Sequence, residues 1–462
     1  MSKELLMDDI LKEKAKNENV KLPKDLDIKI DKTLLELPHR SKSKRGKGFK
    51  RFVTAAGIAL TIITCFSVAF PTYARNIPIV KSVLEFLGEK NIRYKDYIEY
   101  SSDLNLSDTS NGVKVTINSI VYDGIYLSIA YTYESKDEII ERPYMMHRDL
   151  KINGSLTDGF STGSGRFLDK NTYMGVYTIS VSNDYIPEYS MKNSLIENIE
   201  NIDDFTMDLN IKAFSNDIWG DWKFKLKVPK NEMVKNINKV DLSVDLSEVR
   251  EGLKANEVIF TPINTILRLS ENNSWSVAGG TAGSIGNFIV VDDKGRNLRS
   301  ISGEGYTPSS DAKEFYSQEQ YRGIYKDTNS VTFIPVVSKK DERHVSEYEK
   351  NEVLLNNEGE TILSYGNLGE YIITKVEFLE DKTLVHYKCT GFIETHYGFA
   401  LSMVDSDGKE YKFATENLIE GDNEYIAEIE ALPKDKQYKL TAPDYGKIYE
   451  VKEDLKFTVD VK

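Results

Sequence analysis

The chain has 462 residues, a length typical of about three compact domains. Its 60 Lys and Arg against 73 Asp and Glu give a formal net charge of −13, which makes nucleic acid a poor candidate partner. Two cysteines are too few for a disulfide framework, so the class of small disulfide-stapled secreted domains is excluded.

Residues 1–37 have the pattern of two short amphipathic helices separated near residues 17–21. Helices of this size are too small to bury both apolar stripes against each other and be stable alone. The stripes are formed by Leu5, Leu6, Ile10, Leu11, Leu26, Ile30, Leu34 and Leu37. We predict that these side chains bind a protein partner. The alternatives are that the helices pack on themselves, dimerise or lie on a membrane surface.

Residues 52–74 contain no charged side chain and follow a strongly basic segment. A helix of this length is roughly 34 Å long at about 1.5 Å per residue, enough to cross a hydrocarbon core of about 30 Å. The preceding basic residues are Arg40, Lys42, Lys44, Arg45, Lys47, Lys50 and Arg51. They predict that this side stays cytoplasmic, because basic flanks are retained inside. The expected protein spans the cell membrane once, with a cytoplasmic N-terminus and an extracellular C-terminus.

Two alternatives compete with a retained transmembrane helix. A cleaved signal peptide is one, because residues 72–74 form a small-x-Ala site, but its apolar run is usually only about 7–15 residues and starts near the first methionine. A buried helix of a soluble domain is the other, although such helices rarely run this far without a charge. The length and late position of the run favour an anchor in the lipid bilayer.

The predicted anchor divides the charge of the chain. Residues 1–51 carry 15 basic and 9 acidic residues, and the remainder carries 45 basic and 64 acidic residues. The basic run beside the anchor is therefore interpreted as facing lipid headgroups rather than nucleic acid. Cys65 lies within the anchor and Cys389 lies far beyond it, a distribution that fits a Gram-positive cell surface.

Beyond the anchor, residues 75–104 predict an extracellular amphipathic helix and linker, with the helix over 76–88 and a further helical turn near Tyr94, Tyr97 and Ile98. The helix is expected to rest on the outer leaflet or on the first folded domain. Gly88 is a suitable helix stop, and a polar linker is expected around 101–112.

From residue 113 the pattern changes to alternation of period two. Two alternating runs flank Asp123-Gly124, which predicts a β-hairpin, and similar openings occur at 256–270 and 371–389. Weak self-similarity at a spacing of roughly 100 residues predicts about three related domains. The fold class expected is mainly β, with immunoglobulin-like β-sandwiches at 105–232, 238–340 and 360–462.

The sequence contains no convergent set of catalytic residues. The G-x-S-x-G string at 159–163 lies in a loop-like context, and the glycine-rich run 279–286 lacks the Gly-Lys-Ser/Thr ending of a phosphate loop. His386 and Cys389 fall on opposite faces of a predicted strand, which argues against a metal site there. We therefore predict that the chain is not an enzyme and has no metal or cofactor.

The join from residue 70 to residue 100, "FPTYARNIPIVKSVLEFLGEKN…YKDYIEY", and the hairpin "VTINSIVYDGIYLSIAYTYES" resemble a family of Gram-positive membrane proteins. That family is described as negative effectors of extracytoplasmic-function sigma factors. The resemblance covers residues 1–230 best. It implies an anti-sigma-like regulator that holds a sigma factor through its cytoplasmic helices and senses an unknown ligand outside.

Two other functions remain open from the sequence. One is a cell-surface binding or adhesion protein with no sigma-factor partner. The other is a cell-wall enzyme, which ranks last because no acid, base and nucleophile set is evident.

Overall fold

The structure is a computed structural model. It describes residues 82–88, 93–157, 161–181, 204–215, 218–229, 237–272, 287–306, 313–339, 349–356, 358–397, 401–413, 418–419 and 424–461. The predicted cytoplasmic helices, the basic run and the apolar stretch 52–74 lie outside these residues, and so do all the predicted partner-binding and membrane-orienting side chains. Among the residues described, no helix is both long enough and apolar enough to span a membrane.

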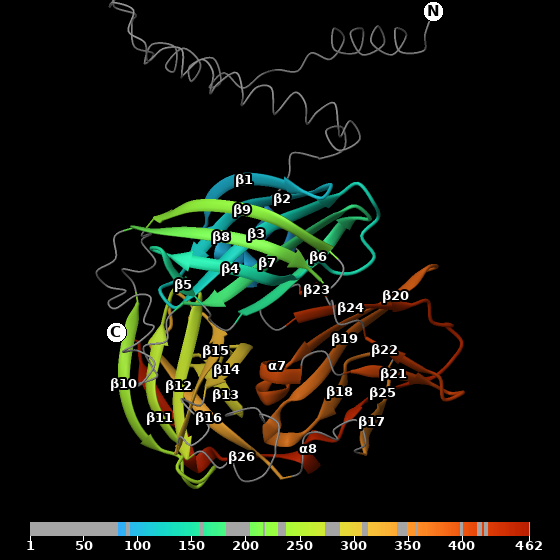
Figure 1. Ribbon diagram of the computed structural model, residues 1–462. Coiled ribbons are helices and arrows are strands. Elements are labelled where there is room, and N and C mark those ends of the chain that lie inside the picture. Colours follow the sequence, from blue (N-terminus) through green and yellow to red (C-terminus); the bar gives the residue numbers. More distant parts are fainter. Residues whose placement is uncertain are drawn as a thin grey trace, which may run out of the picture. The chain divides into compact units, whose positions relative to one another are not determined.

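The described residues confirm the expectation of a mainly β fold, with a few short helices (Figure 1). Their strands form six antiparallel sheets, which we name A to F, and these share buried cores two by two. Each pair of sheets thus has the layered form of a β-sandwich. The finer expectation of immunoglobulin-like domains with the three stated boundaries remains a prediction.

Sheets A and B form the first pair. In spatial order, sheet A contains β1 (Ser102–Ser110), β2 (Val113–Tyr122), β3 (Tyr126–Ser135), β7 (Thr172–Ser180) and β6 (Ser161–Asp169). Sheet B contains β5 (Ser155–Thr157), β4 (Met145–Ile152), β8 (Asp204–Phe214) and β9 (Ile218–Pro229). The predicted hairpin at Asp123-Gly124 is confirmed, because β2 and β3 pair across it and Gly124 has a φ of 96°. The expected polar linker around 101–112 is wrong, because β1 occupies most of it and pairs with β2.

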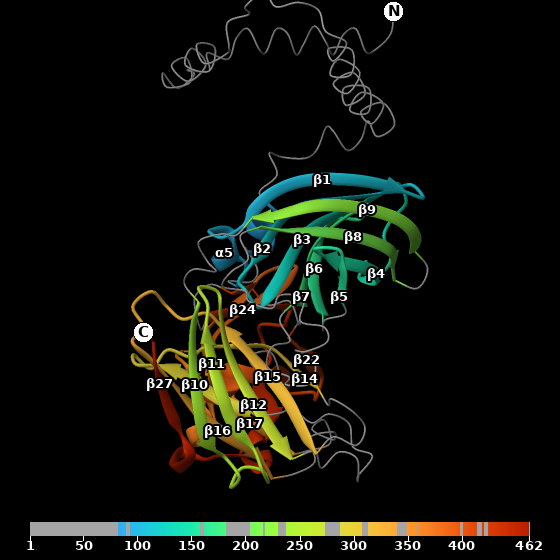
Figure 2. The same cartoon turned by 60° about the vertical axis from the view of Figure 1, so that its left-hand side comes forward.

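Two short helices cover the outer face of sheet A (Figure 2). They are α4 (Val83–Gly88) and α5 (Arg93–Ile98). A capping box starts α4, because the Glu85 carboxylate accepts a bond from the Ser82 amide at 2.8 Å and the Ser82 hydroxyl accepts one from the Glu85 amide at 3.2 Å. Val83, Leu84 and Tyr97 are buried against residues of β2, β3 and β7. Since both faces of sheet A are covered, residues on both sides of β3 and β7 are buried, rather than every second residue.

Sheets C and D form the second pair. Sheet C contains, in spatial order, β10 (Asn238–Asp245), β11 (Lys254–Phe260), β12 (Asn264–Asn272), β15 (Glu314–Arg322) and β14 (Ser300–Tyr306). Sheet D contains β13 (Asn287–Asp292), β16 (Ser330–Ser338), β26 (Tyr449–Val451) and β27 (Phe457–Asp460), the last two both pairing with β16. Figure 2 shows the red end of the chain beside the yellow-green strands of this pair.

Sheets E and F form the third pair. Sheet E contains β17 (Lys350–Leu354), β25 (Tyr438–Pro443), β21 (Ser402–Asp405) and β22 (Glu410–Lys412). Sheet F contains β18 (Thr361–Ser364), β19 (Glu370–Phe378), β20 (Lys382–Cys389), β24 (Glu424–Glu430) and β23 (Leu418–Ile419). The remaining short helices are η5 (Gly366–Leu368), α7 (Gly391–Tyr397), α8 (Tyr445–Ile448) and η6 (Glu453–Leu455).

The internal similarity seen in the sequence reappears in the strand order. Sheets A, C and F each have five strands in the same arrangement: three consecutive strands, then the fifth, then the fourth at the edge. The second sheets of the pairs differ, because β26 and β27 return from the end of the chain to sheet D. The strands of the third pair therefore lie within 350–443. This range starts before the predicted segment 360–462 and ends before it, because β26 and β27 belong to sheet D.

Candidate functional site

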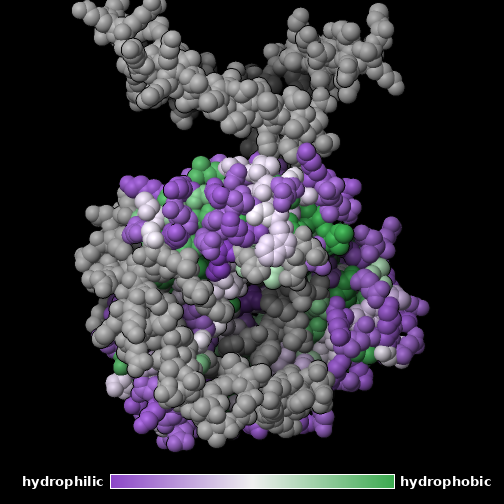
Figure 3. All heavy atoms as spheres, viewed as in Figure 1, coloured by the Kyte–Doolittle hydropathy of each residue, from purple (hydrophilic) through white to green (hydrophobic). Residues whose placement is uncertain are grey.

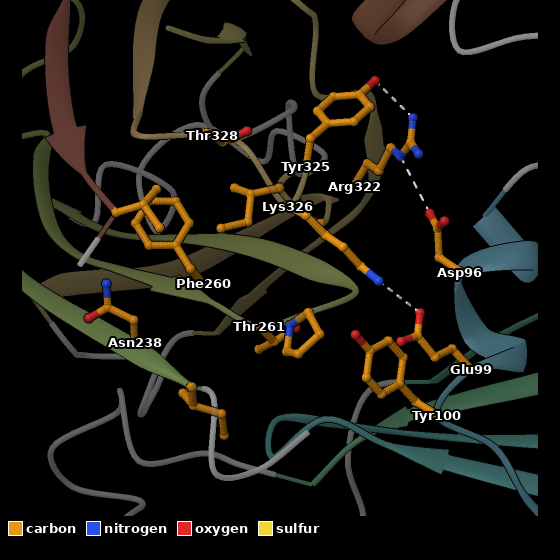
Figure 4. Close-up of a pocket in the computed structure, with 15 residues that line it drawn as sticks. Asp96, Glu99, Tyr100, Asn238, Phe260, Thr261, Arg322, Tyr325, Lys326 and Thr328 are labelled. Carbon is orange, nitrogen blue, oxygen red and sulfur yellow. Dashed lines mark hydrogen bonds and ion pairs between the residues drawn. The ribbon is translucent and has the colours of Figure 1, made fainter. Parts of the chain in front are cut away.

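A hollow of about 760 Å³ lies between α5 and one end of the second pair of sheets (Figure 4). Its volume is in the range that small-molecule sites usually have. Its lining comes from α5 and the residues just after it, the start of β10, the turn between β11 and β12, the segment after β15, and Val461. The hollow thus combines residues that are more than 300 positions apart in the chain.

Two ion pairs join α5 to the segment after β15. Arg322 Nε lies 3.4 Å from a carboxylate oxygen of Asp96, and Lys326 Nζ lies 3.5 Å from a carboxylate oxygen of Glu99. Both distances exceed the roughly 2.7–2.9 Å of a strong charge-assisted hydrogen bond. The end of β15 and the segment after it therefore present two positive charges, each in a long ion pair with a carboxylate on α5 or just after it.

Tyr325 fixes the guanidinium of Arg322. Arg322 Nη1 donates to the Tyr325 hydroxyl at 2.9 Å, and its guanidinium carbon lies 4.6 Å from the centre of the ring. On the same ring, the guanidinium carbon of Arg296 lies 3.9 Å from the centre. Such cation–π contacts favour a positive group at a fixed position. The side chain of Arg322 is only 15% exposed, so its position is set by packing as well as by charge.

The side of the hollow opposite the ion pairs combines apolar side chains with an amide. Phe260 and Asn238 lie there in Figure 4, opposite Arg322 and Lys326. Within the part of the chain that the structure describes, the Nδ2 atom of Asn238 is buried and has no hydrogen-bond acceptor. A buried donor without an acceptor is costly, and such groups call for an explanation. Near the rim, burial and the neighbouring Glu99 carboxylate raise the pKa of Tyr100.

The floor of the hollow is tied to the first pair of sheets through Thr261. Its hydroxyl donates at 3.2 Å to the buried carboxylate of Asp123, which also accepts bonds from the Ile125 amide at 3.0 Å and the Tyr126 amide at 2.7 Å. Asn264 donates a further short bond to the same carboxylate. Burial raises the pKa of Asp123, whereas these bonds lower it. The hollow is therefore attached to a rigid polar junction between two pairs of sheets.

That junction continues across the outer face of sheet C. Gln320 donates to Asn264 at 2.7 Å, and Gln318 donates to the Tyr126 hydroxyl at 3.0 Å. Ile259 and Ile266 of sheet C are buried in the same apolar cluster as the core of the first pair. The first two pairs are thus joined by buried polar and apolar contacts, not by a linker alone.

The sequence reasoning did not identify the residues of this hollow. It identified the helical turn around Tyr94 and Tyr97, which α5 confirms, but gave no role to Asp96 on that helix or to Glu99 just after it. The residues meet only after folding, so spacing along the chain gives no signal for them. The unmatched amide of Asn238 likewise becomes evident only in three dimensions.

The other motifs singled out in the sequence do not form a site in the described residues. Ser161 of the G-x-S-x-G string lies on β6 and leads into β7, not into a helix. His386 pairs with Glu377 at 2.7 Å, whereas Cys389 is buried in the third core. Among the described residues, no group of three His, Cys, Asp or Glu side chains could hold a metal ion. The run 279–286 lies outside them.

Two segments of the chain match families of unknown function. Residues 44–135 match a family described as "Domain of unknown function (DUF4179)", and residues 235–363 match one described as "Family of unknown function (DUF5643)". The first match runs from the basic segment through β3, and the second covers all of sheet C, β13 and β16 of sheet D, and the start of the third pair.

Solved structures also include chains similar to this one. One of them is described as "The crystal structure of the conserved domain protein from Bacillus anthracis". The similarity covers 60% of this chain and 90% of that one, with 23% identity and a TM-score of 0.42. No curated protein matches the chain.

Proposed function

We propose that this protein is a single-pass membrane regulator of anti-sigma type. Its segment 1–51 binds an extracytoplasmic-function sigma factor on the cytoplasmic side, and its β domains, of immunoglobulin-like form, respond to a ligand outside. Membrane attachment keeps the bound sigma factor away from RNA polymerase until the ligand signal arrives.

The observation that carries this proposal is the join between the apolar run and the folded part. Only eight residues, 75–82, separate the predicted anchor from Val83, where α4 begins, and α4 packs directly on sheet A. Eight residues reach at most about 28 Å. A chain built in this way keeps its β domains close to the outer surface of the membrane. The family match over 44–135 spans the same join and supports its treatment as one unit.

Capture of the sigma factor by the full chain tests the cytoplasmic half of the proposal. The full chain, tagged and purified from membranes, is expected to retain an extracytoplasmic-function sigma factor encoded beside it. Leu34→Asp places a charge on the apolar stripe of the second predicted helix and is expected to lower capture about tenfold or more, because a desolvated charge disrupts a helix-in-groove contact.

The matched control is Lys32→Asp, which puts the same side chain on the opposite face of that helix and is expected to leave capture unchanged. Equal capture by the wild-type chain and the Leu34→Asp variant would contradict the proposed binding face. Absence of any sigma factor from the wild-type preparation would favour the alternative of a surface binding protein.

A further inference from the structure

One side of the hollow beside α5 carries Arg322 and Lys326, each paired with a carboxylate, and the opposite side carries Phe260 and the unmatched amide donor of Asn238. We infer that it binds a small organic anion, a carboxylate or phosphate group carried on an apolar body. Arg322 and Lys326 would hold the anionic group, and Phe260 with its neighbours on the opposite side, Asn238 among them, would contact the rest of the ligand. This inference concerns the ectodomain alone and does not depend on a sigma-factor partner.

Burial decides the sign of the ligand charge. Arg322 is 15% exposed and held against Tyr325, whereas its partner Asp96 is 34% exposed and Glu99 is 61% exposed. An anion that replaces the two carboxylates lets them turn into water at little cost. A cation would instead have to replace Arg322 and leave a fixed, poorly hydrated guanidinium without its counter-charge, which is far more costly.

The geometry of the existing pairs also favours replacement. The Arg322–Asp96 and Lys326–Glu99 ion pairs, at 3.4 and 3.5 Å, are longer than a strong charge-assisted bond. A ligand anion inside the hollow can approach closer than side chains fixed to a short helix. On the opposite side of the hollow, the buried Nδ2 of Asn238 is a donor available to an acceptor elsewhere on the ligand.

Occupation of the hollow has a structural consequence. The two ion pairs connect α5 to the second pair of sheets, and α5 follows α4, the first described helix. A ligand that competes with Asp96 and Glu99 weakens this connection while the buried contacts of Tyr97 on sheet A remain. We therefore expect looser packing of α5 against the second pair of sheets when the ligand is bound.

The experiment compares four probes that share an aromatic body. Phenylacetate, phenyl phosphate, benzyl alcohol and phenethylamine are titrated against the full chain in lipid nanodiscs, with saturation-transfer NMR as readout. At least one of the two anions is expected to bind about tenfold or more tightly than the alcohol and the amine, because bonds to charged groups are the strong ones. The two anions distinguish a carboxylate site from a phosphate site.

Two variants with opposite expected effects separate binding from mere stability. Lys326→Ala is expected to weaken anion binding about two- to fivefold, and Glu99→Gln, which removes a competing carboxylate, is expected to strengthen it by a similar factor. The control is Glu453→Gln, which removes a carboxylate from an exposed ion pair with Lys456 outside the hollow. That pair, at 3.4 Å, is similar in length to the pair of Glu99, and its loss should leave anion binding unchanged.

Hydrogen exchange gives a second readout on the same samples. Saturating anion is expected to speed amide exchange in 93–98 and to leave the strands of sheet F unchanged. Equal binding of the amine and the anions, binding that Glu99→Gln fails to strengthen, or absence of binding by both anions would each overturn the inference.

Discussion

At the scale of single residues, Glu319 has a carboxyl group whose pKa is set by its surroundings. It lies on β15, opposite Leu267 of β12 and Gly303 of β14. A Cβ atom at position 303 would come within 2.5 Å of a Glu319 carboxylate oxygen, so glycine there leaves the room that this side chain needs. Burial, the largest cause, and the negative charge of Glu304 raise the pKa of Glu319 to about 8, although the positive charge of Arg250 acts to lower it.

This raised pKa predicts a pH dependence of stability. The folded chain holds a proton on Glu319 that the unfolded chain releases near the ordinary glutamate pKa, so the contribution of this group to stability is fully present below about pH 4.5 and is lost as the pH rises towards 8. The loss is at most about 1.4 kcal/mol per pH unit. Glu319→Gln is expected to flatten this part of the profile, measured as the free energy of unfolding in urea between pH 5 and 8.

A suitable control is Glu314→Gln, which changes an exposed carboxylate at the start of the same strand. It should leave the profile as it is in the wild-type chain. A Glu319→Gln profile that coincides with the wild-type profile would show that the buried carboxylate is not the titrating group.

At the scale of elements, the chain completes its second pair of sheets only at its end. After β16 it builds the whole third pair, and it then returns through β26 and β27, which both pair with β16. Phe457 of β27 stacks on Phe333 of β16 with ring centres 5.2 Å apart, and Val459 is buried in the core between sheets C and D. In strand order, the third pair is therefore inserted into the second.

This connectivity predicts where a mutation near the end of the chain acts. Val459→Asp buries a charge in the second core and is expected to cost about 3 kcal/mol or more. Hydrogen exchange should accelerate in β12 and β16 and remain slow in β19 and β20. The matched variant Ile429→Asp, in the third core, should give the reverse pattern, with faster exchange in β19 and β20. Faster exchange confined to sheets E and F in the Val459→Asp variant would contradict the insertion.

At the scale of the whole molecule, the described residues form layers that share their buried surfaces. Sheet C contributes to the first core as well as its own, and residues of sheet D such as Ile289 and Val336 are buried with the third core. The described surface in Figure 3 is largely hydrophilic, with apolar patches on the first pair. The largest exposed apolar side chains include Ile140, which is 93% exposed, and Trp219, which is 54% exposed.

The proposed topology can be tested on the whole chain with single cysteines. Cys389 is buried and Cys65 lies in the predicted anchor, so neither should react quickly with a membrane-impermeant maleimide. Asp137→Cys, at an exposed position of the first pair, is expected to be labelled in intact cells. Ser2→Cys is expected to be labelled only after lysis. Labelling of both positions in intact cells would contradict a cytoplasmic N-terminus.

The sequence by itself determined the local elements of this protein. The alternating runs around Asp123-Gly124 and at 256–270 and 371–389 predicted hairpins that the structure contains, because a hairpin depends on residues that are adjacent in the chain. The helical turn at 93–98 was predictable for the same reason. So was the mainly β class, since period-two alternation is a local property of a strand.

Only the tertiary structure decided which distant segments meet. The return of β27 to β16, the burial of Glu319 and the meeting of Asp96 with Arg322 join positions that no periodicity relates. The sequence pattern placed β1 in a linker because its outward residues are polar, whereas pairing with β2 makes it a strand. Such contacts form when the gain from burial exceeds the entropy of closing long loops, and that balance depends on the whole packed chain rather than on any window of it.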